Sequence, residues 1–315
     1  MIEVSEITKY YGDFPAVTDL SFTVEQGEIL GFLGPNGAGK STTMKMLTGF
    51  MPPTAGSIRI AGFDIVEQSI DARKHIGYLP ETVPLYLDMT VSEYLGFMGT
   101  IRGLNSKEVT RRRAIVVEQC NLGDYYSTYI GKLSKGYRQR VGISQAILHE
   151  PDVLVLDEPT IGIDPIQVVE TRKLIKSLGQ EHTLILSSHI LPEVSMICDR
   201  VIIIHEGKIV AIDNPKKLGD NLSGVERVEL EIKGVNKKIV PVLKEVEGVQ
   251  ELKIIPVTSG GGYHRYHLTV DLGSDIRHLL AKTVIDNDWE LLKLQSFGMT
   301  LEEIFLKLTI EEDTP

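Results

Sequence analysis

A glycine-rich segment between an apolar strand and a helix constrains the fold of this chain most. Residues 34–41 read GPNGAGKS, which fits the pattern G-x-x-x-x-G-K-[ST] of a phosphate-binding loop. The apolar run Ile29–Leu33 precedes this loop, and a helix is expected from Lys40. The backbone N–H groups of such a loop, together with the positive end of the helix, face an anion. The segment therefore predicts a nucleotide-binding site at the end of a strand.

Two side chains of this loop have expected chemical roles. Lys40 can reach the outer phosphates, and the hydroxyl of Ser41 can ligate Mg²⁺. The alternative is a glycine-rich turn beside a surface lysine, which the strand–loop–helix context disfavours. The residues expected to hold the nucleotide here are Gly34, Pro35, Asn36, Gly37, Ala38, Gly39, Lys40, Ser41 and Thr42.

A second apolar strand ends in two carboxylates. Asp157 and Glu158 follow the run Val153–Leu156, and the carboxyl ends of such strands face the ligand crevice of an α/β sheet. Asp157 is expected to hold Mg²⁺, often through water. Glu158 is the expected general base for an attacking water molecule. A solvated acidic turn is the alternative, and the phosphate-binding loop makes it the weaker interpretation.

The first two thirds of the chain predict an α/β fold. Short β-branched runs alternate with helical patterns, which indicates a mostly parallel sheet covered by helices. Ile2–Ile7 and Ile58–Ile60 are expected to form further, antiparallel strands, and residues 90–129 a helical insertion within a helical subdomain of about residues 85–150. The expected parallel strands are Glu28–Leu33, Val153–Leu156, Thr183–Ser187 and Val201–Ile204.

The pattern changes after Asn214-Pro215. Arg227–Lys233 alternates strictly between apolar and charged residues, as a half-buried strand does. The expected order from there is β-α-β-β-α-β-α, and its last helix begins with a capping box of Thr300 and Glu303. The first six elements match a ferredoxin-like α+β unit. The predicted domains are residues 1–222 and a C-terminal accessory domain, residues 223–315.

Composition limits the possible partners. The formal net charge is -10, which disfavours nucleic acid as the principal partner. No apolar run approaches the ~20 residues that span a bilayer, so a cytoplasmic chain is expected, with any membrane contact made through a partner. Cys120 and Cys198 lack the spacing of a metal site and are expected to be buried and reduced.

Residues 1–222 contain the phosphate-binding loop followed by the acidic strand end, and they resemble the nucleotide-binding domains of ABC transporters. The segment LSKGY at 133–137 lies where that family has its LSGGQ signature, and Gly162-Ile163-Asp164 resembles its D-loop. The resemblance implies that Ser134 and Gly136 contact the γ-phosphate bound by a second copy, and that Asp164 lies at the dimer interface. It therefore implies a homodimer with ATP between the two copies.

Three further positions follow from the resemblance. His189 matches the switch histidine that contacts the γ-phosphate, and Tyr11 matches the aromatic residue that stacks on adenine, with Tyr10 as the competing candidate. Glu81 occupies the Q-loop position, where it could ligate Mg²⁺ as a hard oxygen donor. Ser187 and Ser188 beside His189 could suggest a nucleophile and its base, but no nucleophile elbow surrounds them.

This sequence departs from the usual family pattern at three positions. Lys135 and Tyr137 stand where the family usually has Gly and Gln, and Glu81 replaces the usual Gln. Such variants, together with the ending Thr300–Leu306, resemble the ATPases of ABC-2-type exporters. The gliding-motility-associated ATPases are the nearest group that the resemblance names.

The expected function is that of an ATP-hydrolysing subunit, with ATP and Mg²⁺ as cofactors, that powers a separate integral membrane permease from the inner face of the cell membrane. Export is favoured by the resemblance alone. Two alternatives stay open: a soluble ABC ATPase that does not transport, and a catalytically weak regulatory subunit suggested by Glu81 and the altered signature.

Overall fold

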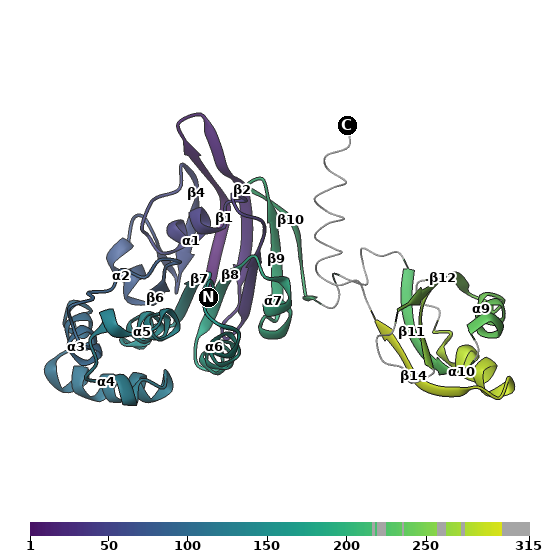
Figure 1. The fold of residues 1–315 in the computed structure, drawn as a ribbon. Coiled ribbons are helices and arrows are strands. Elements are labelled where there is room, and N and C mark those ends of the chain that lie inside the picture. Colours follow the sequence, from purple (N-terminus) through teal and green to yellow (C-terminus); the bar gives the residue numbers. More distant parts are fainter. Residues whose placement is uncertain (216–217, 219–224, 235, 257–262, 272–274, 298–315) are drawn as a thin grey trace. The chain divides into compact units, whose positions relative to one another are not determined.

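The computed structural model describes residues 1–215, 218, 225–234, 236–256, 263–271 and 275–297 (Figure 1). The chain divides into two compact units, Met1–Asn214 and Pro215–Pro315. The predicted boundary near residue 222 lies outside the described residues, so the division into residues 1–222 and 223–315 stays a prediction.

A six-stranded sheet forms the centre of the first unit. Five of its strands are parallel, while the edge strand β10 runs antiparallel to β9. β3, β7 and β8 are buried along their whole length, which explains their unbroken apolar runs. The strand order is β10 (Lys208–Asp213), β9 (Arg200–His205), β3 (Ile29–Leu33), β8 (Thr183–Ser188), β7 (Val153–Asp157) and β6 (Ile76–Leu79).

An antiparallel sheet covers the phosphate-loop helix α1 (Lys40–Leu47). The sheet has the order β2 (Phe14–Val24), β1 (Ile2–Tyr11), β4 (Ala55–Ile60) and β5 (Phe63–Asp64), which confirms the antiparallel prediction. Apolar side chains of α1 join one core cluster with residues of both sheets. The rings of Phe22 and Phe32, one from each sheet, have centroids 5.9 Å apart. The helix that follows the phosphate loop is therefore anchored between two sheets.

Helices fill the predicted insertion and cover the large sheet. Capping boxes start α3 and α4, with Thr90 and Glu93 at the first and Asn105 and Glu108 at the second. Arg112 of α4 is buried and donates to the carbonyl groups at the end of α5. Besides α1, the helices of this unit are α2 (Ser69–Lys74), α3 (Val91–Ile101), α4 (Ser106–Gln119), α5 (Lys135–Ile147), α6 (Pro165–Leu178) and α7 (Leu191–Ile197), with short 3₁₀ turns at Gly123–Tyr125 and Ile130–Lys132.

The described part of the second unit has the predicted order β-α-β-β-α-β. Its antiparallel sheet runs β12-β13-β11-β14, and Val228, Leu230 and Ile232 of β11 lie in its core, against which the single tryptophan, Trp289, packs. The predicted last helix, with Thr300 and Glu303, lies outside the described residues. The elements are β11 (Val225–Lys233), α9 (Asn236–Lys244), β12 (Val249–Ile255), β13 (Tyr263–Asp271), α10 (Arg277–Asp286) and β14 (Glu290–Phe297).

Two expectations drawn from composition can be compared with the structure. Cys120 and Cys198 are buried and carry free thiols, and burial raises the pKa of Cys120 to about 11. Both thiols are therefore protonated and shielded at neutral pH. Among the described helices, none is both long enough and apolar enough to cross a membrane.

The approach of α5 to β6 depends on a glycine, which generates the first prediction. A Cβ on Gly77 would lie 2.2 Å from the carbonyl oxygen of Ala146 and 2.6 Å from a methyl of Leu154. Because backbone must shift to admit it, we expect Gly77→Ala to destabilise the first unit by about 1–3 kcal/mol. Gly123→Ala is the control, since nothing lies within 4 Å of its Cβ position. Scanning calorimetry measures both; equal unfolding temperatures for the two variants would contradict the expectation.

Candidate nucleotide site

Strand register brings three distant segments to one edge of the large sheet. β8 lies between β3 and β7, and Ser188 pairs with Leu33 while Ser187 pairs with Asp157. The carboxyl ends of the three strands therefore meet. The phosphate loop follows β3, Glu158 follows β7 and His189 follows β8, so all three emerge at this edge.

Close backbone packing explains the glycines of the phosphate loop. Gly39 has a φ of +103°, and a Cβ there would lie 2.7 Å from the carbonyl oxygen of Ala16. A Cβ on Gly34 would lie 2.4 Å from the carbonyl oxygen of Ile204. The loop is thus wedged between β2 and β9 and accepts no side chain at either position. Its Lys40 is buried, and the ammonium donates to the carbonyl oxygens of Gly34 (2.8 Å) and Pro35 (3.1 Å).

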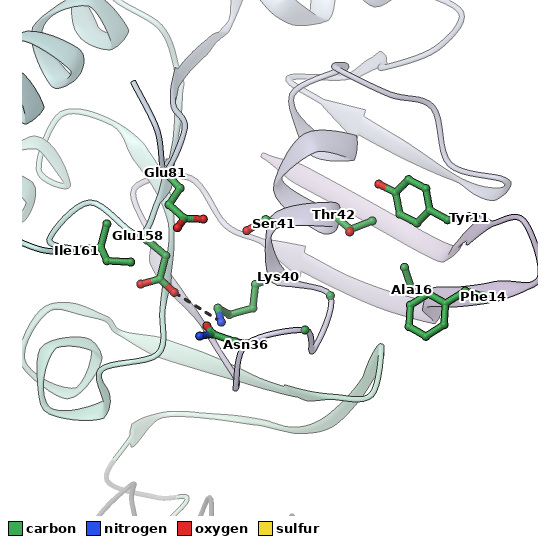
Figure 2. A pocket seen from close by; sticks show the side chains of 12 residues that line it. Tyr11, Phe14, Ala16, Asn36, Lys40, Ser41, Thr42, Glu81, Glu158 and Ile161 are labelled. Carbon is green, nitrogen blue, oxygen red and sulfur yellow. Dashed lines mark ion pairs between the residues drawn. The ribbon is translucent and has the colours of Figure 1, made fainter. Parts of the chain in front are cut away.

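The loop forms one wall of a cavity of about 460 Å³ (Figure 2). Tyr11 and Phe14 lie on one side of it, and Glu81 and Glu158 lie on the other, with Lys40 between them. The cavity thus has an aromatic side and an ionic side. Its lining residues are Tyr11, Phe14, Ala16, Asn36, Gly37, Gly39, Lys40, Ser41, Thr42, Glu81, Glu158 and Ile161.

Asp157 is a buried carboxylate held by two hydroxyl groups. Ser187 Oγ donates to Asp157 Oδ1 at 2.6 Å, and Ser41 Oγ donates to the same oxygen at 3.4 Å. Burial raises the pKa of Asp157 above its ordinary value, and the two hydroxyls oppose that rise. The nearby carboxylates of Glu158 and Glu81 add to the rise in pKa. This oxygen is therefore placed to interact with a cation beside Ser41.

Glu158 connects the phosphate loop to the residue after β8. Its Oε1 lies 3.5 Å from Lys40 Nζ, and its Oε2 lies 2.8 Å from His189 Nδ1. The backbone has a φ of +50°, a left-handed conformation that non-glycine residues seldom adopt, and its N–H donates to Ser187 Oγ at 2.9 Å. Such strained positions cluster at functional sites. The turn aims a buried carboxylate into the cavity.

The structure gathers most of the predicted nucleotide-site residues and separates a few. Tyr11 lines the cavity, whereas Tyr10 does not. Asp157 and His189 do not line the cavity, but each forms a hydrogen bond with a residue that does. Pro35 and Ala38 instead line a neighbouring cavity, which shares Asn36 and Gly37 with the nucleotide cavity. Gly34, Ser134, Gly136 and Asp164 do not line the nucleotide cavity.

The predicted signature and D-loop residues have local structural roles in this chain. Ser134 caps α5 by accepting a hydrogen bond from the N–H of Tyr137, and Asp164 caps α6. A Cβ on Gly136 would lie 1.2 Å from Gln167 Oε1, so the side chain of Gln167 occupies the space that a side chain at residue 136 would need. A Cβ on Gly162 would lie 2.2 Å from the ammonium nitrogen of Lys135. The signature segment and the D-loop therefore pack against each other.

Sequence reasoning missed four residues of the site, one of which is Ala16, a cavity-lining residue of β2. Phe14 lines the aromatic side from the start of β2, a strand that the sequence analysis did not predict. Ile161 lines the ionic side. Ser187 was considered only as a nucleophile, whereas its hydroxyl joins Asp157 to the backbone of Glu158. A hydroxyl residue at the end of a buried strand beside an acidic strand end is the signal that could have indicated this bridge.

Comparison with known proteins extends these observations. The model of the ABC transporter family matches residues 17–161. The linearmycin resistance ATP-binding protein LnrL of Bacillus subtilis (strain 168) is 33% identical over 317 residues, covering 98% of each chain. The bacitracin transport ATP-binding protein BcrA of Bacillus licheniformis is 35% identical over 317 residues, covering 98% of this chain and 97% of that protein.

A solved structure is similar to a smaller part of the chain. That of cbiO1 from Clostridium perfringens, part of the ABC transporter complex cbiONQ, has 28% identity and a TM-score of 0.64. It covers 69% of this chain and 89% of its own. Because the two relatives match nearly the whole sequence and the cavity has the loop and the carboxylates of an ATPase, the chain belongs to the ABC transporter family as an ATP-binding, ATP-hydrolysing subunit.

Proposed function

We propose that two copies of this ATPase clamp ATP between them and power export through a separate permease at the inner face of the membrane. The Glu158 carboxylate, between Lys40 and His189 on the ionic side of the cavity, is the observation that carries the catalytic part of this proposal. The printed names of the two relatives, one for linearmycin resistance and one for bacitracin transport, support the export of a toxic compound.

The two sides of the cavity suggest how ATP lies in it. Adenine stacks on Tyr11 at the aromatic side, with Phe14 beside it, and the phosphates reach the loop and Lys40. The γ-phosphate then lies next to Glu158, whose carboxylate orients a water molecule and accepts its proton. His189 contacts the γ-phosphate and steadies the Glu158 carboxylate through Nδ1. Catalysis is mainly positioning and stabilisation of charge.

The donor set beside the loop fits Mg²⁺ bound together with phosphate. Ser41 and Asp157 offer hard oxygen atoms within 3.4 Å of each other, and Glu81 lines the same cavity. Among the described residues no group of three or more His, Cys, Asp or Glu side chains could hold a metal unaided. Mg²⁺ usually takes one or two carboxylates together with phosphate oxygens, and when bound it would neutralise those oxygens.

Three predicted site residues that lie outside the cavity support a site completed by a second copy of the chain. Ser134, Gly136 and Asp164 do not line the cavity of their own chain. Ser134 caps a helix, so its hydroxyl and the first N–H groups of α5 form one end of a dipole that favours an anion. In the proposed dimer, this end of α5 meets the γ-phosphate that the other copy binds, and Asp164 crosses the interface.

A second concave surface fits the permease. We name it the docking groove: a cavity of about 600 Å³ with apolar walls, most of which follow Glu81 in the sequence. Exposed aromatic and aliphatic side chains at a concavity are typical of sites that receive an amphipathic helix. The groove is lined by Lys45, Phe50, Tyr78, Pro80, Thr82, Val83, Pro84, Tyr86, Tyr94, Phe97, Met98, Ile101, Arg102 and Gln145.

Glu158→Gln tests the catalytic assignment. The amide keeps the shape but cannot accept a proton, so turnover falls about 100- to 10,000-fold while ATP still binds. The unhydrolysed nucleotide holds the two copies together, which light scattering with ATP detects as a stable dimer. Glu81→Gln is the control; it removes a carboxylate from the same cavity and installs the residue usual for the family, so phosphate release continues. Wild-type turnover in Glu158→Gln would refute the assignment, and no phosphate release from the parent chain would favour a regulatory subunit.

Asp157→Asn tests two expected effects of the buried carboxylate, one on the stability of the nucleotide-free protein and one on Mg²⁺ binding. The folded-state pKa of Asp157 is raised, which means that folding favours the protonated form of this carboxyl. Its contribution to the free energy of unfolding is therefore lost as the pH rises through that pKa, and at neutral pH the buried charge lowers the stability of the protein. We expect the nucleotide-free variant to unfold at a higher temperature than the parent at neutral pH, a difference that shrinks as the pH falls. The variant should also lose the additional rise in unfolding temperature that the parent shows when Mg²⁺ is supplied together with ATP. Exposed Asp88 provides the control, Asp88→Asn; identical behaviour of the two variants would contradict the expectation.

Tyr11→Ala and Tyr10→Ala form a matched pair for adenine stacking. The two rings are adjacent in sequence and similarly exposed, at 47% and 46%, but only Tyr11 lines the cavity. Loss of an aromatic ring stacked on a base costs roughly 1–3 kcal/mol, so Tyr11→Ala should weaken ATP binding by about 5- to 150-fold. Tyr10→Ala should bind as the parent does. Calorimetric titration with ATP measures both, and a larger loss in Tyr10→Ala would reverse the assignment.

A further inference from the structure

The aromatic side of the nucleotide cavity lies at the tip of a hairpin. β1 ends at Tyr11 and β2 begins at Phe14, and these two residues pair across the connecting turn. The Tyr11 side chain is half-exposed. An exposed aromatic side chain can occupy three staggered χ1 rotamers. A ring that must meet a base in one orientation therefore needs a contact that selects one rotamer.

Met51 supplies such a contact from the segment that follows α1. The hydroxyl of Tyr11 donates to Met51 Sδ at 3.2 Å, although the two residues lie 40 positions apart in the sequence. Among the described residues, none accepts a hydrogen bond from the hydroxyl of Tyr10, the adjacent ring. This difference accompanies the one already described, that Tyr11 lines the cavity and Tyr10 does not.

Two further hydrogen bonds hold the segment that carries Met51 against the end of β1. The ammonium of Lys9 donates to the carbonyl oxygen of Pro52 at 2.7 Å. The N–H of Thr54 donates to the carbonyl oxygen of Thr8, also at 2.7 Å. Because these bonds tie the two segments together, the sulfur keeps a fixed place relative to the strand that bears the ring.

The side chain of Met51 suits its two surroundings. It is partly buried and packs against the core cluster that α1 shares with the two sheets. A thioether is apolar enough for that position and still accepts a weak hydrogen bond. Met51 does not line the nucleotide cavity, so any effect that its sulfur has on a bound nucleotide passes through Tyr11.

The same segment links the ring to the phosphate loop. α1 begins at Lys40 and ends at Leu47. The N–H of Met51 donates to the carbonyl oxygen of Lys45, in the last turn of this helix, at 3.4 Å. Met51 therefore follows directly from the helix that starts at the phosphate loop, and the contact with Tyr11 sets the spacing between ring and loop.

We propose that Met51 is a positioning residue for ATP, whose sulfur holds the Tyr11 ring in the orientation that stacks on adenine. This assignment rests on the proposed function and goes beyond it by naming the group that orders the stacking ring. Apparent affinity scales with the fraction of the protein that is competent to bind. A released ring that divides its time among three rotamers, one of them competent, would therefore bind ATP about threefold more weakly.

Met51→Leu removes the acceptor and keeps an apolar side chain of similar volume. We expect the KM for ATP, and the Kd from calorimetric titration, to rise about threefold while kcat is unchanged, because Met51 contacts neither the phosphates nor Glu158. The affinity for inorganic tripolyphosphate, which has no base, should equal that of the parent. Met51→Gln places an amide oxygen at a similar reach and should restore the parental Kd for ATP. A parental Kd for ATP in Met51→Leu, or an equal loss for tripolyphosphate, would overturn the assignment.

A double-mutant cycle tests the route through the hydroxyl. Tyr11→Phe keeps the ring but cannot donate to the sulfur, so it should weaken ATP binding as Met51→Leu does. The double variant should bind no more weakly than either single variant, because both remove the same hydrogen bond. Two effects that multiply would show that Met51 acts by another route. Met196→Leu is the control, since this exposed methionine of α7 accepts a hydrogen bond from Arg172 instead, and it should bind ATP as the parent does.

Tyr11→Ala distinguishes a failure of this assignment from a failure of the proposed function. If Tyr11→Ala weakens ATP binding and Met51→Leu does not, the role of Met51 is refuted and adenine stacking stands. If Tyr11→Ala binds ATP as tightly as the parent does, adenine stacking on this ring is refuted and the role of Met51 with it.

Discussion

The register between β7 and β8 is the constraint on which the rest of the site depends. It places Ser187 beside Asp157, and one hydroxyl then donates to the Asp157 carboxylate while accepting the N–H of Glu158. That bridge stabilises the left-handed turn at Glu158 and so directs a buried carboxylate toward Lys40. A slip of one residue in either strand would move these side chains to the opposite face of the sheet. The pairing of these two strands thus fixes the positions of the Asp157 and Glu158 carboxylates.

The sequence predicted the parts of the molecule where a local pattern has one physical meaning. Unbroken apolar runs predicted the buried strands β3, β7 and β8, and strict alternation predicted β11 of the second unit. The glycine-rich pattern predicted a loop between a strand and a helix, and the structure has that loop between β3 and α1. In each of these cases, the constraint acts within a few residues, so the pattern is visible without the rest of the chain.

Other features depend on contacts between distant segments, which a single sequence does not display. β6 is only four residues long and contains Gly77, whose missing side chain makes room for α5 rather than marking a turn. Phe14 reaches the cavity only because β2 folds back on β1. The docking groove brings together Lys45 of α1 and Arg102 at the end of α3, and no sequence motif relates these two residues. Such arrangements are set by tertiary packing and are found only when the fold is known.

The single tryptophan gives the second unit a property that the first unit lacks. Trp289 packs against the core of the C-terminal sheet, and every residue of the nucleotide cavity belongs to the other unit. Indole emission therefore reports on the accessory unit alone, whereas the cavity has no indole fluorophore of its own. A change in that emission on addition of ATP would show that nucleotide binding in the first unit alters the surroundings of Trp289, without a dye or a mutation.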